Sequence, residues 1–216
     1  MVFQLRRAIS VDLAAGSGGR MLDLATGTGE ISVAVAKAAG VNTAHLNGLS
    51  KGMLAVCRKQ FEIWERAPKT LFTKQDAFVL MEDSEPEAYD LVLALGLIAH
   101  TGKLDRLLTL IERALVPGGA VLLQSSLDDR LGARLMGLYA RSLFCSARYK
   151  VASYSSNDSE VAARKAGLEN QVVRRFCVCL PFGDKLPLAI NYLLERTFAA
   201  KCGKGGDALF LLRKPA

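Results

Sequence analysis

Residues 20–30 read RMLDLATGTGE, and this stretch decides the fold. A short apolar run that holds one acid, Asp23, breaks into a turn carrying Gly27 and Gly29. From Ile31 onward, apolar residues recur at helical spacing, so the pattern predicts a strand, a glycine turn and a helix. Glycine lets a ligand approach the backbone closely, and the helix N-terminus offers unpaired N–H groups with a partial positive charge. The stretch therefore predicts a site for a nucleotide-like cofactor that carries a carboxylate or phosphate.

Two classes of cofactor use such a turn. A dinucleotide fingerprint reads G-x-G-x-x-G or A, and its third small residue allows close packing of helix on strand. Here that third position is Ser32, and Glu30 would place a negative charge near a pyrophosphate. Both details count against NAD and FAD. The stretch LDLATGTGE instead resembles motif I of the class I S-adenosylmethionine-dependent methyltransferases, with Ala25 where the first glycine usually stands.

Four further segments resemble the same superfamily, in its order and at its spacing. They are LNGLSKGML (46–54), LFTKQDAF (71–78), YDLVLALGLIAH (89–100) and RALVPGGAVLLQSS (113–126). The motifs are most similar to those of ubiquinone/menaquinone-biosynthesis C-methyltransferases, although they are too widely shared to indicate a substrate. The resemblance implies an α/β fold: a Rossmann-like, seven-stranded, mostly parallel sheet with helices on both faces and a C-terminal antiparallel hairpin. We expect one domain over residues 1–216, with 127–168 as an insertion on the substrate side.

The alternation of strand-like and helix-like segments favours the same architecture. Strands are predicted near 20–25, 42–47, 70–75, 90–95, 119–125, 170–179 and 207–213. Helices are predicted near 2–15, 30–39, 51–65, 103–115, 130–147, 158–166 and 187–200.

The resemblance also implies where S-adenosylmethionine binds. Its predicted contacts are Asp23, Ala25, Thr26, Gly27, Gly29, Asn47, Gly48, Leu49, Met53, Asp76, Ala77 and Leu95. Asp76 takes the place of the acid that binds the adenine amino group. Gly48 is a departure, because the family has an acid there that accepts hydrogen bonds from both ribose hydroxyls. Losing such a charge-assisted contact weakens binding by about 1.5–3 kcal/mol, unless the adjacent Asn47 accepts one bond.

His100 is the candidate catalytic residue, because it follows the fourth predicted strand near the expected methyl donor. Its unperturbed pKa suits a general base at neutral pH, which methyl transfer needs only when the nucleophile must lose a proton. The alternative is a histidine that caps or packs a helix. His45, within the second strand, is predicted to be structural.

Charge is distributed unevenly along the chain, which has a net charge of +7. Residues 1–108 balance twelve basic against twelve acidic side chains, whereas residues 109–216 carry sixteen against nine. On a helix over 130–147 and just beyond, four arginines share one face: Arg130, Arg134, Arg141 and Arg148. This face is either a solvated surface or a site for an anionic substrate or lipid headgroup.

The leading hypothesis is therefore a cytoplasmic methyltransferase that acts on a small, lipophilic or anionic molecule. A second hypothesis is a non-catalytic, methyltransferase-like partner subunit, motivated by Gly48 and by the short segment before the first strand. A nucleic-acid methyltransferase ranks lowest, because the chain lacks an N/D-P-P-Y/F motif and a basic–aromatic extension. The five cysteines lack C-x-x-C pairs, so buried thiols are favoured over a metal site. No apolar run is long enough to span a membrane or to act as a secretion signal, and an oligomer remains open.

Overall fold

The computed structural model describes residues 2–127, 152–176, 190, 193 and 206–216. Its helices are α1 (Val2–Ala14), α2 (Glu30–Ala39), α3 (Lys51–Glu62), α4 (Ala77–Asp83), α5 (Leu97–Thr101), α6 (Leu104–Ala114) and α8 (Ser156–Lys165). Its strands are β1 (Gly19–Asp23), β2 (Val41–Asn47), β3 (Lys69–Thr73), β4 (Tyr89–Ala94), β5 (Leu115–Ser126), β6 (Glu169–Phe176) and β7 (Asp207–Arg213).

Within the described residues, seven strands form one sheet in the order β3-β2-β1-β4-β5-β7-β6. The pairs β1–β2, β2–β3, β1–β4 and β4–β5 are parallel, whereas β7 runs antiparallel to both β5 and β6. Because the chain leaves β1 toward β2 on one side and later returns to β4 on the other, the strand order reverses between β1 and β4. Open α/β sheets bind their ligands in the crevice at such a switch point, outside the carboxyl ends of the strands.

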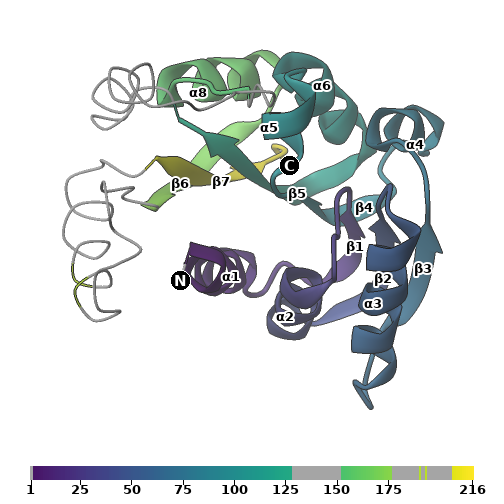
Figure 1. Cartoon of the computed structure of the whole chain (residues 1–216). Helices are drawn as coiled ribbons and strands as arrows, with labels where there is room; N and C mark the ends of the chain where they lie inside the picture. The colour runs from purple at the N-terminus through teal and green to yellow at the C-terminus, as the bar shows by residue number, and fades with distance from the viewer. Residues whose placement is uncertain (1, 128–151, 177–189, 191–192, 194–205) are drawn as a thin grey trace.

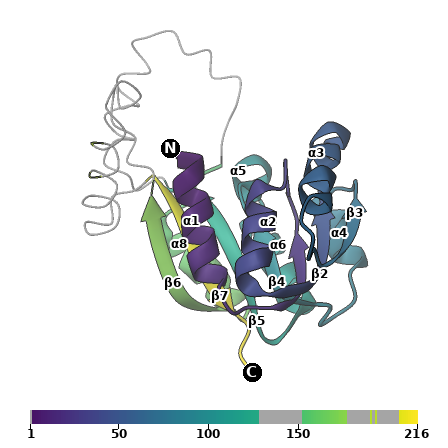
Figure 2. The same cartoon turned by 90° about the horizontal axis from the view of Figure 1, so that it is seen from below.

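Helices cover both faces of the sheet (Figures 1 and 2). On one face, α1, α2 and α3 enclose a cluster of buried side chains that includes Met21, Leu46 and Leu93. On the other face, α4, α6 and α8 enclose a second cluster that includes Leu22 and Val92. Successive residues of β1 enter opposite clusters, as the two-residue period of a strand requires. The central strands are thus buried on both sides, and this explains their nearly continuous apolar sequence.

The predicted fold is confirmed, including the antiparallel C-terminal strands. The structure adds two short helices that the sequence did not predict, α4 and α5, and it lengthens the fifth strand to Leu115–Ser126. Helices of seven and five residues are too short to show a clear helical period. The helix predicted at 130–147, with the four-arginine face, lies outside the described residues. Of the helix predicted at 187–200, only Ile190 and Leu193 are described, and both are helical. No helix of the described part is long and apolar enough to cross a membrane.

Candidate functional site

The turn between β1 and α2 is shaped by two glycines with left-handed backbone conformations. Gly29, with φ 84°, stands at the N-cap of α2. A Cβ there would lie 2.5 Å from Cys57 Sγ on α3, so only glycine allows the two helices this close. Gly27, with φ 56°, has nothing within 4 Å of its would-be Cβ, so at this position the backbone conformation alone favours glycine. Gly27 lines a cavity.

A network of hydrogen bonds between buried polar side chains supports this turn. Ser32 Oγ donates a 2.6 Å hydrogen bond to Asp23 Oδ2 and lies 2.7 Å from Thr26 Oγ1. Asp23 Oδ1 accepts a bond from the Ala25 N–H at 3.1 Å. Burial raises the pKa of Asp23 to about 6, although these hydrogen bonds and the charge of Arg6 oppose the rise. Ser32, which counted against a dinucleotide fingerprint, thus orients an acid beside the glycine turn.

The cavity above the turn has a volume of about 220 Å³ and lies at the switch point between β1 and β4. Six of the predicted cofactor contacts line it: Asp23, Ala25, Thr26, Gly27, Met53 and Leu95. The structure adds five lining residues that the sequence analysis did not identify: Phe3, Arg6, Thr28, Glu30 and Ile31. The last three directly continue the glycine turn and could have been found from their position. Phe3 and Arg6 come from α1, which has no local signal for a ligand.

Arg6 places a positive charge against this cavity. Its Nη1 donates to Gln124 Oε1 near the carboxyl end of β5, at 3.2 Å. Its guanidinium carbon lies 5.2 Å from the centre of the Phe3 ring. The buried Nε has no hydrogen-bond partner among the described residues, and burial lowers the pKa of Arg6 from its usual value. A buried N–H without a partner is costly, so this side chain is suited to receive an anionic ligand group.

The residues at the end of β2, Asn47 and Gly48, differ from the family pattern, which has an acid there. Asn47 is 1% exposed, and its Oδ1 accepts bonds from Thr73 Oγ1 at 2.9 Å and from the Gln75 N–H at 3.2 Å. Its Nδ2 donates to the backbone carbonyls of Leu24 and Gln75. The side chain therefore ties β2 to its neighbouring strands. Gly48 follows without a left-handed φ, and the atoms nearest its would-be Cβ lie at ordinary contact distances of 3.6–3.8 Å.

Asp76 begins α4 and has one carboxylate oxygen to spare. Its Oδ1 accepts from the backbone N–H groups of Phe78 at 2.8 Å and Val79 at 3.3 Å, which caps the helix. Within the described part of the chain, Oδ2 has no partner, as a contact to an adenine amino group would require. Ala77 is buried behind it, whereas Leu49 on the β2 side is 68% exposed. Gly29, Asn47, Gly48, Leu49, Asp76 and Ala77 do not line the cavity as it is shaped here.

The two histidines have different surroundings. His100 lies exposed on α5 after β4 and is not among the residues that line the cavity. His45 lies half-buried between strands, with Nδ1 2.9 Å from the Tyr89 hydroxyl and Nε2 3.0 Å from Thr73 Oγ1. Burial lowers the pKa of His45 and raises that of Tyr89. This supports the structural role predicted for His45.

Comparison with known proteins adds independent findings. Residues 21–119 match a family model described as a methyltransferase domain. No curated protein sequence matches the chain. Among solved structures, a protein of Bacillus halodurans assigned as a methyltransferase shares 18% identity at a TM-score of 0.71, with 97% of this chain and 99% of that one covered. A SAM-dependent methyltransferase of Archaeoglobus fulgidus shares 14% at a TM-score of 0.63, over 98% and 92%. The [4+2]-cyclase SpnF shares 18% at a TM-score of 0.67, over 99% and 83%.

These findings show that residues 21–119 match a methyltransferase-domain family model and that the chain shares the Rossmann-like fold of solved SAM-dependent methyltransferases. They do not distinguish a ubiquinone-type branch, so that narrower resemblance stays a prediction. The cyclase shows that the fold alone does not specify the reaction.

Proposed function

We propose that this chain is an S-adenosylmethionine-dependent methyltransferase that acts on a small molecule. One observation carries the proposal: the cavity at the switch point is lined by two carboxylates, Asp23 and Glu30, and by one guanidinium, Arg6. The methionine end of the cofactor is a zwitterion, so its ammonium and carboxylate groups each find an opposite charge in the cavity. The partner-less Nε of Arg6 and the spare Oδ2 of Asp76 are the polar atoms that such a ligand would satisfy.

When bound, the cofactor supplies an electrophilic methyl group on its sulfonium. The chain's own contribution is binding and orientation, which can provide most of the catalysis of a direct displacement. In this proposal Asp76 holds the adenine end and the glycine turn takes the ligand against the backbone. Asp23 and Arg6 would hold the amino-acid end, and Leu95, directly after β4, lines the same cavity.

The acceptor would approach from the carboxyl ends of β4 and β5. The excess of basic residues in 109–216 favours an anionic acceptor or a lipophilic one with an anionic group. His100 remains the proposed general base for an acceptor that must lose a proton. Its exposed position on α5 permits this role without requiring it.

Calorimetric titration of two ligands would test the cofactor site. S-adenosylhomocysteine carries the zwitterionic end, whereas 5′-methylthioadenosine lacks it. We expect Arg6→Met to weaken binding of the first about tenfold and to leave the second unchanged, since one charge-assisted contact is lost. Asp23→Asn should behave in the same way. Arg7→Met, at the exposed neighbouring position, is the matched control and should bind both ligands as the wild type does.

Equal losses for both ligands would show that Arg6 does not contact the amino-acid end. No binding of S-adenosylhomocysteine to the wild type at millimolar concentration would reject the proposed function itself. Methyl transfer from labelled cofactor to a panel of acceptors then separates an enzyme from a non-catalytic subunit. Tight binding without transfer, with turnover appearing only beside a partner protein, would favour the subunit.

A further inference from the structure

The strand β3 forms one edge of the sheet. Among the described residues, no strand pairs with its outer side, since β2 is its only partner. An edge strand presents a row of unpaired N–H and C=O groups that can bind another extended chain. Its side chains are only partly covered: Leu71 is 56% exposed, and Lys69 and Thr70 are also exposed. The side chains of the first three residues of β3 are therefore exposed, and those of the last two are partly buried.

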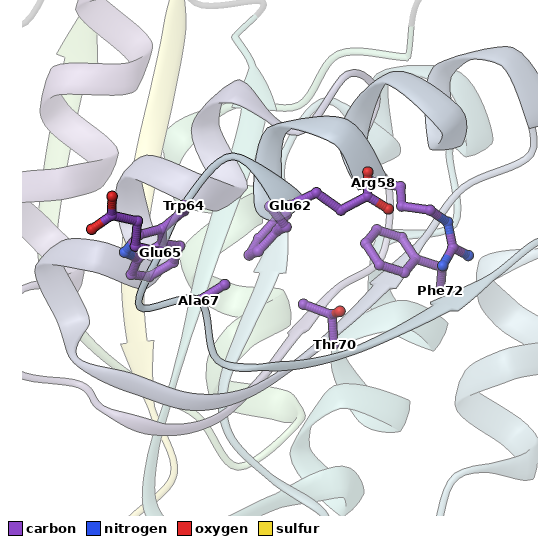
Figure 3. A pocket seen from close by; sticks show the side chains of 8 residues that line it. Arg58, Glu62, Trp64, Glu65, Ala67, Thr70 and Phe72 are labelled. Atoms are coloured by element: carbon purple, nitrogen blue, oxygen red, sulfur yellow. The ribbon is translucent and has the colours of Figure 1, made fainter.

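A second cavity, of about 250 Å³, adjoins this edge (Figure 3). Phe61 at the end of α3, Trp64 in the following turn and Phe72 on β3 supply its aromatic walls. The Phe61 ring lies 6.2 Å from Trp64 and 6.3 Å from Phe72, between ring centres, so this buried ring packs against both of the others. Thr70 shares the face of β3 that carries Phe72, as the alternation of a strand requires. The cavity is large enough for one bulky apolar side chain.

The surroundings of the cavity carry an excess of positive charge. Arg58, Lys59, Arg66, Lys69 and Lys74 are all exposed, and none of them forms an ion pair with another described residue. Arg58 stacks its guanidinium over the Phe72 ring at 4.4 Å. Two acids, Glu62 and Glu65, line the cavity itself; Figure 3 shows the Glu65 carboxylate directed away from Thr70 and Phe72 and the Glu62 carboxylate directed toward Arg58. The excess of positive charge therefore lies outside the cavity, at residues on or beside β3 such as Lys69 and Lys74. Charge complementarity thus favours an acidic ligand along this edge.

We propose that the edge of β3 and the adjoining cavity bind an extended, acidic segment of a partner protein. The backbone of the segment adds a strand beside β3, and one large apolar side chain enters the cavity between Trp64 and Phe72. Flanking acidic side chains then face Arg66 and Lys69. This surface is separate from the cavity at the switch point, so the proposal holds whether or not the chain transfers methyl groups.

A phage-displayed library of short random peptides, selected against the full chain, would test this. We expect enrichment of acidic peptides with one large apolar residue. Hydrogen exchange with a bound, enriched peptide should show slower exchange of the backbone amides of 69–73, because strand addition gives them partners. Failure to enrich such peptides, or unchanged exchange in 69–73, would overturn the proposal.

Two variants locate the site by fluorescence anisotropy with the same peptide. Ala67→Phe fills the cavity from an exposed turn, and the pair Arg66→Glu with Lys69→Glu reverses the charge of the edge. Each should weaken binding at least about tenfold, from lost burial or from repulsion. The control Lys165→Glu, exposed on α8, should bind as the wild type does. Equal affinity in all the variants would reject binding of a partner segment at this site. Dimerisation of the chain that depends on concentration and is abolished by Ala67→Phe would also reject it, and would assign the edge to a second copy of this chain.

Discussion

Gly48→Asp should tighten binding of S-adenosylhomocysteine, because it restores an acid where the family pattern places the ribose hydroxyls. The structure shows that the substitution can be accommodated. A Cβ at Gly48 would lie 3.6 Å from Leu54 Cδ2 and 3.8 Å from Thr26 Cγ2, which are ordinary contacts, and the backbone is not left-handed. Neither a clash nor backbone strain therefore opposes the new side chain.

The size of the effect follows from the contact that is gained. A charge-assisted hydrogen bond contributes about 1.5–3 kcal/mol when its surroundings are adapted to it. Here the surrounding shell has not been shaped for a carboxylate, so we expect about 1 kcal/mol, or about fivefold tighter binding. Gly48→Ala adds the same Cβ without the carboxylate, and it should leave the affinity nearly unchanged.

Calorimetry on the wild type and both variants measures the difference, and circular dichroism confirms that each is folded. Equal affinity for Gly48→Asp and Gly48→Ala, both folded, would refute this placement of the ribose. Asn47 is not an alternative acceptor for the ribose, because its Oδ1 already accepts hydrogen bonds from Thr73 and Gln75. We expect Asn47→Ala to lower the free energy of unfolding, with any change in affinity following from that.

Asp76→Ala should weaken binding of S-adenosylhomocysteine more than His100→Ala does. It should also lower the melting temperature, because it removes a helix cap worth about 1 kcal/mol. Asp76→Asn keeps the cap, so it should bind S-adenosylhomocysteine more weakly with little change in melting temperature. The raised pKa of Asp23, about 6 against an ordinary 3.8, means that the folded state binds the extra proton. Its contribution to the free energy of unfolding therefore falls as pH rises from 3.8 to about 6, and urea titrations should show this slope lost in Asp23→Asn. S-adenosylhomocysteine should bind more weakly below pH 6, because the ammonium then meets a neutral acid; a pH-independent affinity would contradict this role. Gly29→Ala should destabilise the fold by more than about 2 kcal/mol, and Gly27→Ala by about 1 kcal/mol, since only the first adds a clash to the backbone strain. Thermal melts that rank them in the opposite order would contradict this.

The fold could be predicted from sequence because its signals are local. The central strands β1, β4 and β5 contain short apolar runs, and the order of the motifs implied the order of the strands. The glycine turn was also predicted from a local signal, because Gly27 and Gly29 each adopt a positive φ that favours glycine at that position. The short helices α4 and α5 were missed because one or two turns carry no measurable period.

The candidate site was only half predictable, because several of its contacts join distant parts of the chain. Arg6 and Gln124 meet across 118 residues, and nothing near Arg6 in the sequence indicates a ligand. Asn47 was proposed as a substitute for the ribose acid, and only the pairing of β2 with β3 shows that Thr73 and Gln75 use its side chain. Residue type at one position cannot reveal whether a polar side chain is already satisfied.

Hydrogen-bonding capacity separates the supporting residues from the proposed binding residues at this site. The buried polar side chains with their capacity occupied, Asn47 and Ser32, hold strands and the glycine turn in place. Arg6 and Asp76 keep a donor and an acceptor without partners among the described residues, at the two ends of the site. The Arg6 Nε is buried, so its missing partner has a cost that a ligand can remove, whereas the exposed Asp76 Oδ2 is simply available to a ligand. Arg6, which has an unsatisfied atom and also lines the cavity, is therefore the side chain that we propose the cofactor contacts.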